Sequence, residues 1–161
     1  GEAPVLVFLH GGYWRSLDKA AFSHMARGVN RFGLSVAVPN YSLCPDVTIP
    51  EIVDELRQCC LFLHHRFGRR LVIAGHSAGG QFLCRLAGFV PTSAERIVVA
   101  NPGGHLFPSE EFPFPYGFGK LPMQLRGDDA LKRFLAQPMT IYVGTADKLK
   151  DNLPQGEFAD K

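Results

Sequence analysis

Short apolar runs alternate with amphipathic stretches along this chain. Strand-sized apolar runs occur at residues 5–9, 35–38, 71–74, 97–100 and 139–143. Between the first runs, apolar residues recur every three or four positions, which is the spacing of a helix with one buried face. Strands separated by such helices are typical of a parallel sheet buried on both faces. The pattern therefore predicts an α/β fold: a mostly parallel sheet with helices on both faces, in three layers.

Three helices are expected from this pattern. Apolar residues from Phe22 to Val29 follow helical spacing, and Gly33 is expected to end that helix. Residues 48–51, Thr-Ile-Pro-Glu, form a capping box that begins a long helix, which Gly68 ends. A third helix follows residue 77. The stripe of the long helix that should face the sheet contains Ile49, Ile52, Val53, Leu56, Cys60 and Leu63.

Size and charge narrow the class of protein. The 161 residues predict a single domain spanning 1–161. The 17 basic residues are scattered among 15 acidic ones, so a nucleic-acid partner is not expected. Every apolar run is far shorter than the roughly 20 residues of a membrane helix, so no membrane association is expected either. The four cysteines lack CxxC spacing, which favours reduced thiols and a cytoplasmic location.

The strongest chemical signal is Gly75-x-Ser77-x-Gly79. It follows a predicted strand directly and precedes a predicted helix. A tight strand-to-helix turn of this kind raises a serine hydroxyl above the sheet, where it can act as a nucleophile. The alternative is an ordinary glycine-rich turn, but a strained turn that presents a serine has little structural purpose of its own.

A second glycine turn, His10-Gly11-Gly12, follows the first predicted strand. In a hydrolase with this arrangement, the N–H groups of Gly11 and Gly12 form one half of an oxyanion hole, and the Ala78 N–H forms the other half. His10 itself is interpreted as a brace for the loop rather than as a base. The alternative is a glycine turn without a catalytic role.

Together these motifs resemble the α/β-hydrolase superfamily. His10-Gly-Gly-Tyr-Trp14 with Asn40-Tyr-Ser-Leu-Cys-Pro45 is most similar to kynurenine formamidase (arylformamidase) and its esterase relatives. The resemblance implies that the HGGxW segment builds the oxyanion hole and that the GxSxG serine attacks a formamide or ester carbonyl. It is strongest over residues 4–88, and the stretch rich in proline and phenylalanine beyond them departs from the formamidase pattern.

The family order of serine, acid and histidine directs the search for the remaining catalytic groups. Asp147, in Gly-Thr-Ala-Asp after the last predicted strand, fits the acid, with Asp128, Asp129 and Asp151 as competitors. The sequence contains no histidine after His105, which is the only internal candidate for the base. The resemblance implies a histidine some 30 or more residues beyond the acid. We therefore expect that N-terminal strands and a C-terminal histidine-bearing segment are missing from this sequence.

Two interpretations of the aromatic residues stay open. Tyr13 and Trp14 follow the oxyanion turn and could line a substrate pocket, or they could simply cover the end of the sheet. The sequence thus predicts a serine hydrolase that cleaves a small ester or aryl formamide through an acyl-enzyme, with no metal or cofactor. The rival is a non-catalytic binding scaffold that lacks the base. This chain alone is expected to be inactive, and the sequence carries no information on oligomeric state.

Overall fold

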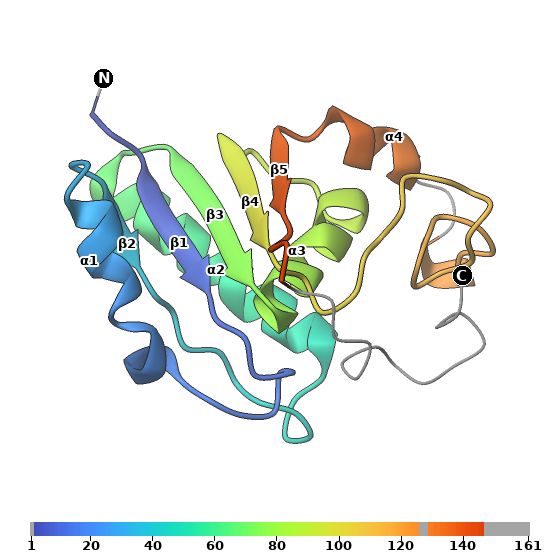
Figure 1. The fold of residues 1–161 in the computed structure, drawn as a ribbon, viewed down its shortest axis with the longest axis horizontal. Helices are drawn as coiled ribbons and strands as arrows, with labels where there is room; N and C mark the ends of the chain where they lie inside the picture. The colour runs from blue at the N-terminus through green and yellow to red at the C-terminus, as the bar shows by residue number, and fades with distance from the viewer. Residues whose placement is uncertain (1, 126–128, 147–161) are drawn as a thin grey trace.

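The computed structural model describes residues 2–125 and 129–146, and its centre is a sheet of five parallel strands (Figure 1). The strand order is β2-β1-β3-β4-β5, and every neighbouring pair is parallel. This confirms the predicted α/β class. The strands are β1 (Val5–Leu9), β2 (Ser35–Ala37), β3 (Leu71–His76), β4 (Arg96–Ala100) and β5 (Met139–Tyr142).

Helices connect the strands and flank the sheet. They are η1 (Lys19–Phe22), α1 (Met25–Asn30), α2 (Ile49–Phe67), α3 (Ala78–Phe89), η2 (Met123–Leu125) and α4 (Ala130–Ala136). The predicted helix from Phe22 to Val29 is interrupted, because Phe22 ends a 3₁₀ turn and the α-helix begins only at Met25. The Ser23 hydroxyl between them donates back to the carbonyl groups of Lys19 and Ala20, which satisfies the end of the first turn locally.

The long helix α2 begins and ends as its sequence predicts. The Thr48 backbone N–H donates to the Glu51 carboxylate at 2.7 Å, which is the capping-box contact. Gly68 adopts a left-handed conformation with φ 61° and donates to the His64 carbonyl. Ile49 was expected in the buried stripe but is 39% exposed, because it is the first residue of the helix and burial starts one turn later, at Ile52.

The two faces of the sheet are covered by different segments. Alternate β1 side chains, Val7 and Leu9, join the main core beneath α2 and α3. Phe8 points to the opposite face, where its ring lies 5.9 Å from the ring of Phe22 in η1. Helices therefore cover both faces, as predicted (Figure 1). No helix in the described ranges has the length and apolar character needed to cross a membrane.

The stretch rich in proline and phenylalanine between β4 and α4 packs onto α3. The buried Phe118 ring lies 5.7 Å from Phe89 of α3 and 5.4 Å from Phe134 of α4, measured between centroids. Gly88 allows this approach, since a Cβ there would lie 2.9 Å from the Phe118 ring. Phe114 contacts Phe89 edge to face. These aromatic residues therefore act mainly as core.

Candidate active site

Ser77 lies on the turn between β3 and α3, at the carboxyl edge of the sheet. Its φ of 55° is in a region that side-chain-bearing residues rarely adopt, at a cost of about 1–3 kcal/mol. Its backbone is fixed from both sides. The Ser77 N–H donates to the Ala100 carbonyl of β4 at 3.1 Å, and its carbonyl accepts from the Gln81 N–H at 2.9 Å. Its side chain is partly exposed, so the hydroxyl is held at the surface edge of the sheet.

The glycines around Ser77 permit close contact between three backbone segments. A Cβ at Gly79 would lie 2.2 Å from the Leu9 carbonyl oxygen of β1. A Cβ at Gly75 would lie 2.6 Å from the backbone of Gly79 itself. The first turn of α3 therefore sits directly against the ends of β1 and β3, and no side chain fits between them.

The same approach brings the first glycine turn to the serine. A Cβ at Gly11 would lie 3.2 Å from the Ser77 Cβ and 3.6 Å from its Oγ. Gly12 has φ 116°, and its carbonyl accepts the N–H groups of Arg15 and Ser16, which closes a tight turn. Ala78 is buried as the first residue of α3, where N–H groups have no acceptor within the helix. The segments expected to supply the nucleophile and the oxyanion donors thus lie together.

His10 is enclosed behind the glycine turn. Only 1% of it is exposed, and its Nδ1 lies 2.8 Å from the Gly11 carbonyl oxygen, a hydrogen bond that requires the proton on Nδ1. Across a planar trans peptide the Gly11 carbonyl and the Gly12 N–H point in opposite directions. Holding the carbonyl at the His10 ring therefore fixes the Gly12 N–H on the other side, away from that ring.

Tyr41 supports His10 in turn. Its ring stacks on the His10 ring at 4.5 Å between centroids, and its hydroxyl donates to the His10 carbonyl at 3.0 Å. The two motif segments are also joined by the Cys44 N–H, which donates to the Trp14 carbonyl at 2.7 Å. Residues 40–45 were predicted only to be part of a family resemblance, and their support of His10 and Trp14 was not predicted. No local sequence signal could have shown it, because Tyr41 and His10 are far apart in the sequence and meet only across the sheet.

Replacing Tyr41 by phenylalanine is expected to lower the free energy of unfolding by about 1–2 kcal/mol, because the buried His10 carbonyl loses its donor. Burial also raises the pKa of Tyr41 from 10.0 to about 12. The folded state favours the neutral phenol, so this contribution is complete below pH 10 and is lost as the pH rises from about 10 through about 12.

Urea unfolding of both proteins between pH 7 and 12 measures this effect. The phenylalanine variant should lose less stability than the parent above pH 10, while the alkaline effects of Cys60 and Cys84 persist in both. An identical pH dependence in the two proteins would exclude Tyr41 as a contributor.

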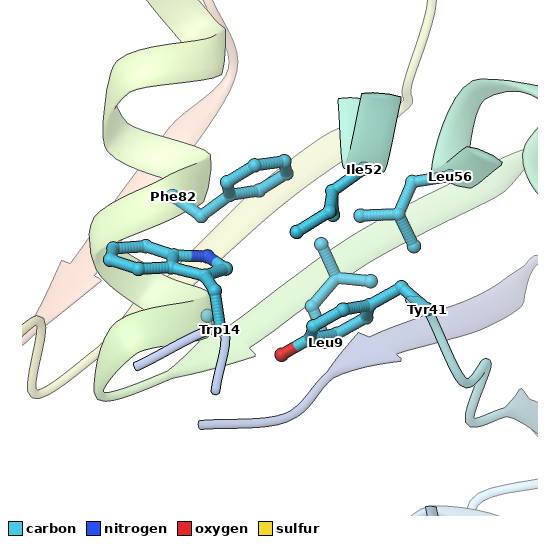
Figure 2. A pocket seen from close by; sticks show the side chains of 7 residues that line it. Leu9, Trp14, Tyr41, Ile52, Leu56 and Phe82 are labelled. Carbon is cyan, nitrogen blue, oxygen red and sulfur yellow. The ribbon is translucent and has the colours of Figure 1, made fainter. Parts of the chain in front are cut away.

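Trp14 and Tyr13 take different positions. Figure 2 shows the Trp14 indole beside the ring of Phe82, and the two centroids are 6.4 Å apart. Trp14 borders an apolar void too narrow for a water molecule, so its side chain packs into the core. Tyr13 is 56% exposed and lies directly after the Gly11–Gly12 turn. The other residues around the void are Leu9, Tyr41, Ile52, Leu56, Gly79 and Phe82.

The candidate acid is reached from the end of β5. Asp147 lies outside the described residues, as do Asp128 and Asp151. The chain leading to it is anchored by Asn101, whose N–H donates to the Tyr142 carbonyl at 2.8 Å and whose Oδ1 accepts the Gly144 N–H at 2.7 Å. This link between the exits of β4 and β5 was not foreseen.

The remaining aspartate has another use, because the Asp129 carboxylate caps α4 by accepting the Lys132 N–H. The candidate bases are not bonded to the serine. The Ser77 hydroxyl forms no hydrogen bond with any of the six histidines within the described ranges. His76 is exposed, and the His105 ring lies 6.1 Å from Phe107.

The cysteines are reduced, and two of them are held as neutral thiols. All four cysteines are free thiols, and burial raises the pKa of Cys60 and of Cys84 to about 11, so both stay protonated at neutral pH. In the part of the chain that the structure describes, no three His, Cys, Asp or Glu side chains are grouped so that they could hold a metal ion.

Comparison with known proteins identifies the class. Residues 6–102, more than half of the chain, match a family model described as alpha/beta hydrolase fold. The chain therefore belongs to the α/β-hydrolase fold family. Among its relatives are kynurenine formamidases. It is 35% identical over 92 residues to that of Drosophila melanogaster, a match that covers 53% of this chain and 30% of the relative. The corresponding values for the Salmo salar protein are 29% over 80 residues, 48% and 27%.

Solved structures agree on the fold. The poly(3-hydroxybutyrate) depolymerase LpqC of Bordetella parapertussis superposes with a TM-score of 0.74 at 25% identity, covering 97% of this chain and 59% of that one. An inhibited esterase B of Lactobacillus rhamnosis has a TM-score of 0.55 at 22% identity, covering 67% and 41%. The matched region spans about 30% of the length of the curated relatives named above.

Proposed function

We propose that this chain carries the nucleophile and the oxyanion hole of a serine hydrolase that acts on small carboxylic esters or aryl formamides. The observation that supports this most is the position of Ser77. Its hydroxyl is raised on a strained turn, and Gly11 approaches so closely that a Cβ there would lie 3.6 Å from the Ser77 Oγ. Membership of the α/β-hydrolase family supports the same assignment.

In the proposed reaction the Ser77 oxygen attacks the substrate carbonyl and forms a tetrahedral intermediate. A histidine oriented by Asp147 takes the serine proton and passes it to the leaving alcohol or amine. The N–H groups of Gly11, Gly12 and Ala78 donate to the negative oxygen, and one such donor is typically worth about 10²–10³ in rate. Water then attacks the acyl-serine while the same histidine accepts its proton, and the histidine returns that proton to the Ser77 oxygen as the acid is released. No metal or cofactor takes part.

The substrate class is supported by the relatives and by one exposed side chain. The curated relatives include kynurenine formamidases, which favours an aryl formamide. Tyr13 offers an exposed aromatic ring next to Gly12, where it could contact an aryl group. Trp14 supports that position from the core. The free thiols fit the proposed cytoplasmic location.

A second candidate is a binding scaffold without hydrolytic activity. It is favoured by one observation: within the described residues, no histidine is hydrogen-bonded to the Ser77 hydroxyl. The two candidates predict different reactivity for the same serine, because an unactivated hydroxyl is a poor nucleophile.

Treatment with a fluorophosphonate, followed by peptide mass spectrometry, tests the assignment. In the 161-residue chain we expect labelling at Ser77 to be slow and to be accelerated by added imidazole, which can act as a general base where no histidine is hydrogen-bonded to the serine. The Ser77→Ala variant is the control and should take up no label at any imidazole concentration. Labelling elsewhere, or none with imidazole present, removes Ser77 from the role and favours the scaffold.

Substrate preference is tested separately on the protein that carries residues 1–161. N-formylkynurenine and a short p-nitrophenyl ester are compared by kcat/KM. A preference for the formamide supports the formamidase assignment, and a pronounced preference for the ester leaves only the general esterase.

A further inference from the structure

A cavity of about 450 Å³ lies between α2, α3 and the sheet, within the size range of small-molecule sites. Its inner wall is apolar and consists of buried side chains from three elements, including Leu56 of α2, Leu83 and Ala87 of α3, and Ile97 of β4. Both helices lie on the same side of the sheet (Figure 1). The cavity is therefore a gap between two helices that share one face.

The mouth of this cavity lies away from Ser77, although its inner end reaches Leu9, the last residue of β1. It opens near the amino ends of the strands, beside Leu71 at the start of β3 and the residues 91–94 that precede β4. Ser77 follows the other end of β3. Six strand residues at about 3.3 Å each place the two ends roughly 16–20 Å apart. A molecule bound here would not occupy the position of a substrate carbonyl at Ser77.

Both charged residues that line the cavity, Arg57 and Arg70, are basic. Arg57, His64 and Arg70 stand at its exposed mouth, together with the hydroxyl groups of Thr92 and Ser93. Arg70 is paired with Glu95 at 2.9 Å. Arg57 forms no ion pair with another residue of the described ranges, so its charge at the mouth is available to an anion.

We propose that this cavity binds a medium-chain fatty acid, with its aliphatic chain between α2 and α3 and its carboxylate at Arg57. An apolar ligand without charge would leave the basic mouth unused, and a small anion would leave the apolar wall exposed to water. A linear aliphatic chain with a terminal carboxylate covers the apolar wall and places a negative charge at the basic mouth.

The chain-length dependence of binding is the first test. Octanoate, decanoate and dodecanoate are titrated calorimetrically into the 161-residue chain below their micelle concentrations. We expect one-to-one binding with Kd falling by up to about fourfold for each added methylene, since one buried methylene is worth about 0.8 kcal/mol. A lack of saturable binding, or a Kd independent of chain length, would overturn the proposal.

The head group is tested by charge reversal. Arg57→Glu should weaken dodecanoate binding by about fivefold or more and leave dodecanol binding unchanged, since an exposed pair contributes up to about a factor of five and reversal adds repulsion. Arg66→Glu is the matched control, because Arg66 is exposed on the same helix but lies over the Phe67 ring and not at the cavity. Equal losses in the two variants would indicate a general charge effect and contradict the site.

A third variant tests the position of the chain. Cys60 lines the cavity wall on α2, so Cys60→Phe should fill part of the space and abolish binding. Circular dichroism shows whether the variant is folded. A folded Cys60→Phe protein that still binds dodecanoate with the parent Kd would exclude this cavity. If Cys60→Phe does not fold, the charge-reversal test still decides the question, because Arg57 is exposed and its replacement should not prevent folding.

Discussion

Substitution of Gly79 by alanine is expected to destabilise the fold by at least about 4 kcal/mol, which is among the largest effects of a single change. The added Cβ would lie 2.2 Å from the Leu9 carbonyl oxygen and 2.8 Å from that of His10. Both atoms are backbone, so neither can rotate away. The first turn of α3 would have to move off the end of β1, and that movement would separate Ser77 from the glycine turn at Gly11.

Urea unfolding monitored by circular dichroism measures this effect. Gly28→Ala is the matched control, because nothing lies within 4 Å of a Cβ there and the residue is inside α1. That variant should gain about 0.5–1 kcal/mol from the lower entropy of the unfolded chain. Equal midpoints for Gly79→Ala and the parent protein would show that the close approach of α3 to β1 is not required.

The strands were predictable because burial on both faces leaves continuous apolar runs. The residues at which the strands end were less predictable. The third strand was predicted to stop at Ala74 but continues to His76, since Gly75 and His76 pair with Val99 and Ala100 of β4. A hydrogen-bonded partner decides where a strand ends, and the partner cannot be read from the local pattern. The capping box and Gly68 predicted both ends of α2 because those signals are local.

The region after β4 shows where local signals fail. The phenylalanines of this region carry no local signal that says what they pack against, and the structure buries Phe118 between α3 and α4. Helix α4 itself was missed, because it is short and its beginning depends on the Asp129 cap. Whether an aromatic residue faces the core or a ligand depends on what packs against it. Trp14 and Tyr13, adjacent in sequence, take opposite positions for this reason.

In the candidate site, too, residues with a local sequence signal were predictable and residues that act through distant contacts were not. Ser77 and the Gly11–Gly12 turn lie beside one another, because they follow neighbouring strands of a parallel sheet and the strand ends meet at one edge. Tyr41, which holds His10 behind the glycine turn, and Asn101, which links the exits of β4 and β5, act through contacts across the sheet and carry no local signature. Asp147 stays a prediction, since it lies outside the described residues.

Replacement of Ser77 separates its chemical role from its structural cost. Ser77→Ala and Ser77→Gly are both expected to reduce kcat by about 10⁴- to 10⁶-fold on the protein that carries residues 1–161, because the attacking oxygen is removed. Their stabilities should differ. Alanine keeps the Cβ at φ 55°, whereas glycine adopts that conformation without strain. Ser77→Gly should therefore unfold at a higher urea concentration than the parent, with a gain of up to about 1–3 kcal/mol.

Ser23→Gly serves as the control for the stability measurement. Ser23 is exposed and has φ −56°, so glycine brings no relief there. The variant also loses the hydroxyl contacts to Lys19 and Ala20, and it should cost about 1 kcal/mol or more. Opposite signs for the two glycine variants would show that the protein retains a strained serine at position 77 at the expense of stability, as expected of a residue kept for its reactivity. A destabilised Ser77→Gly, or an Ser77→Ala variant with parental kcat, would contradict the nucleophile assignment.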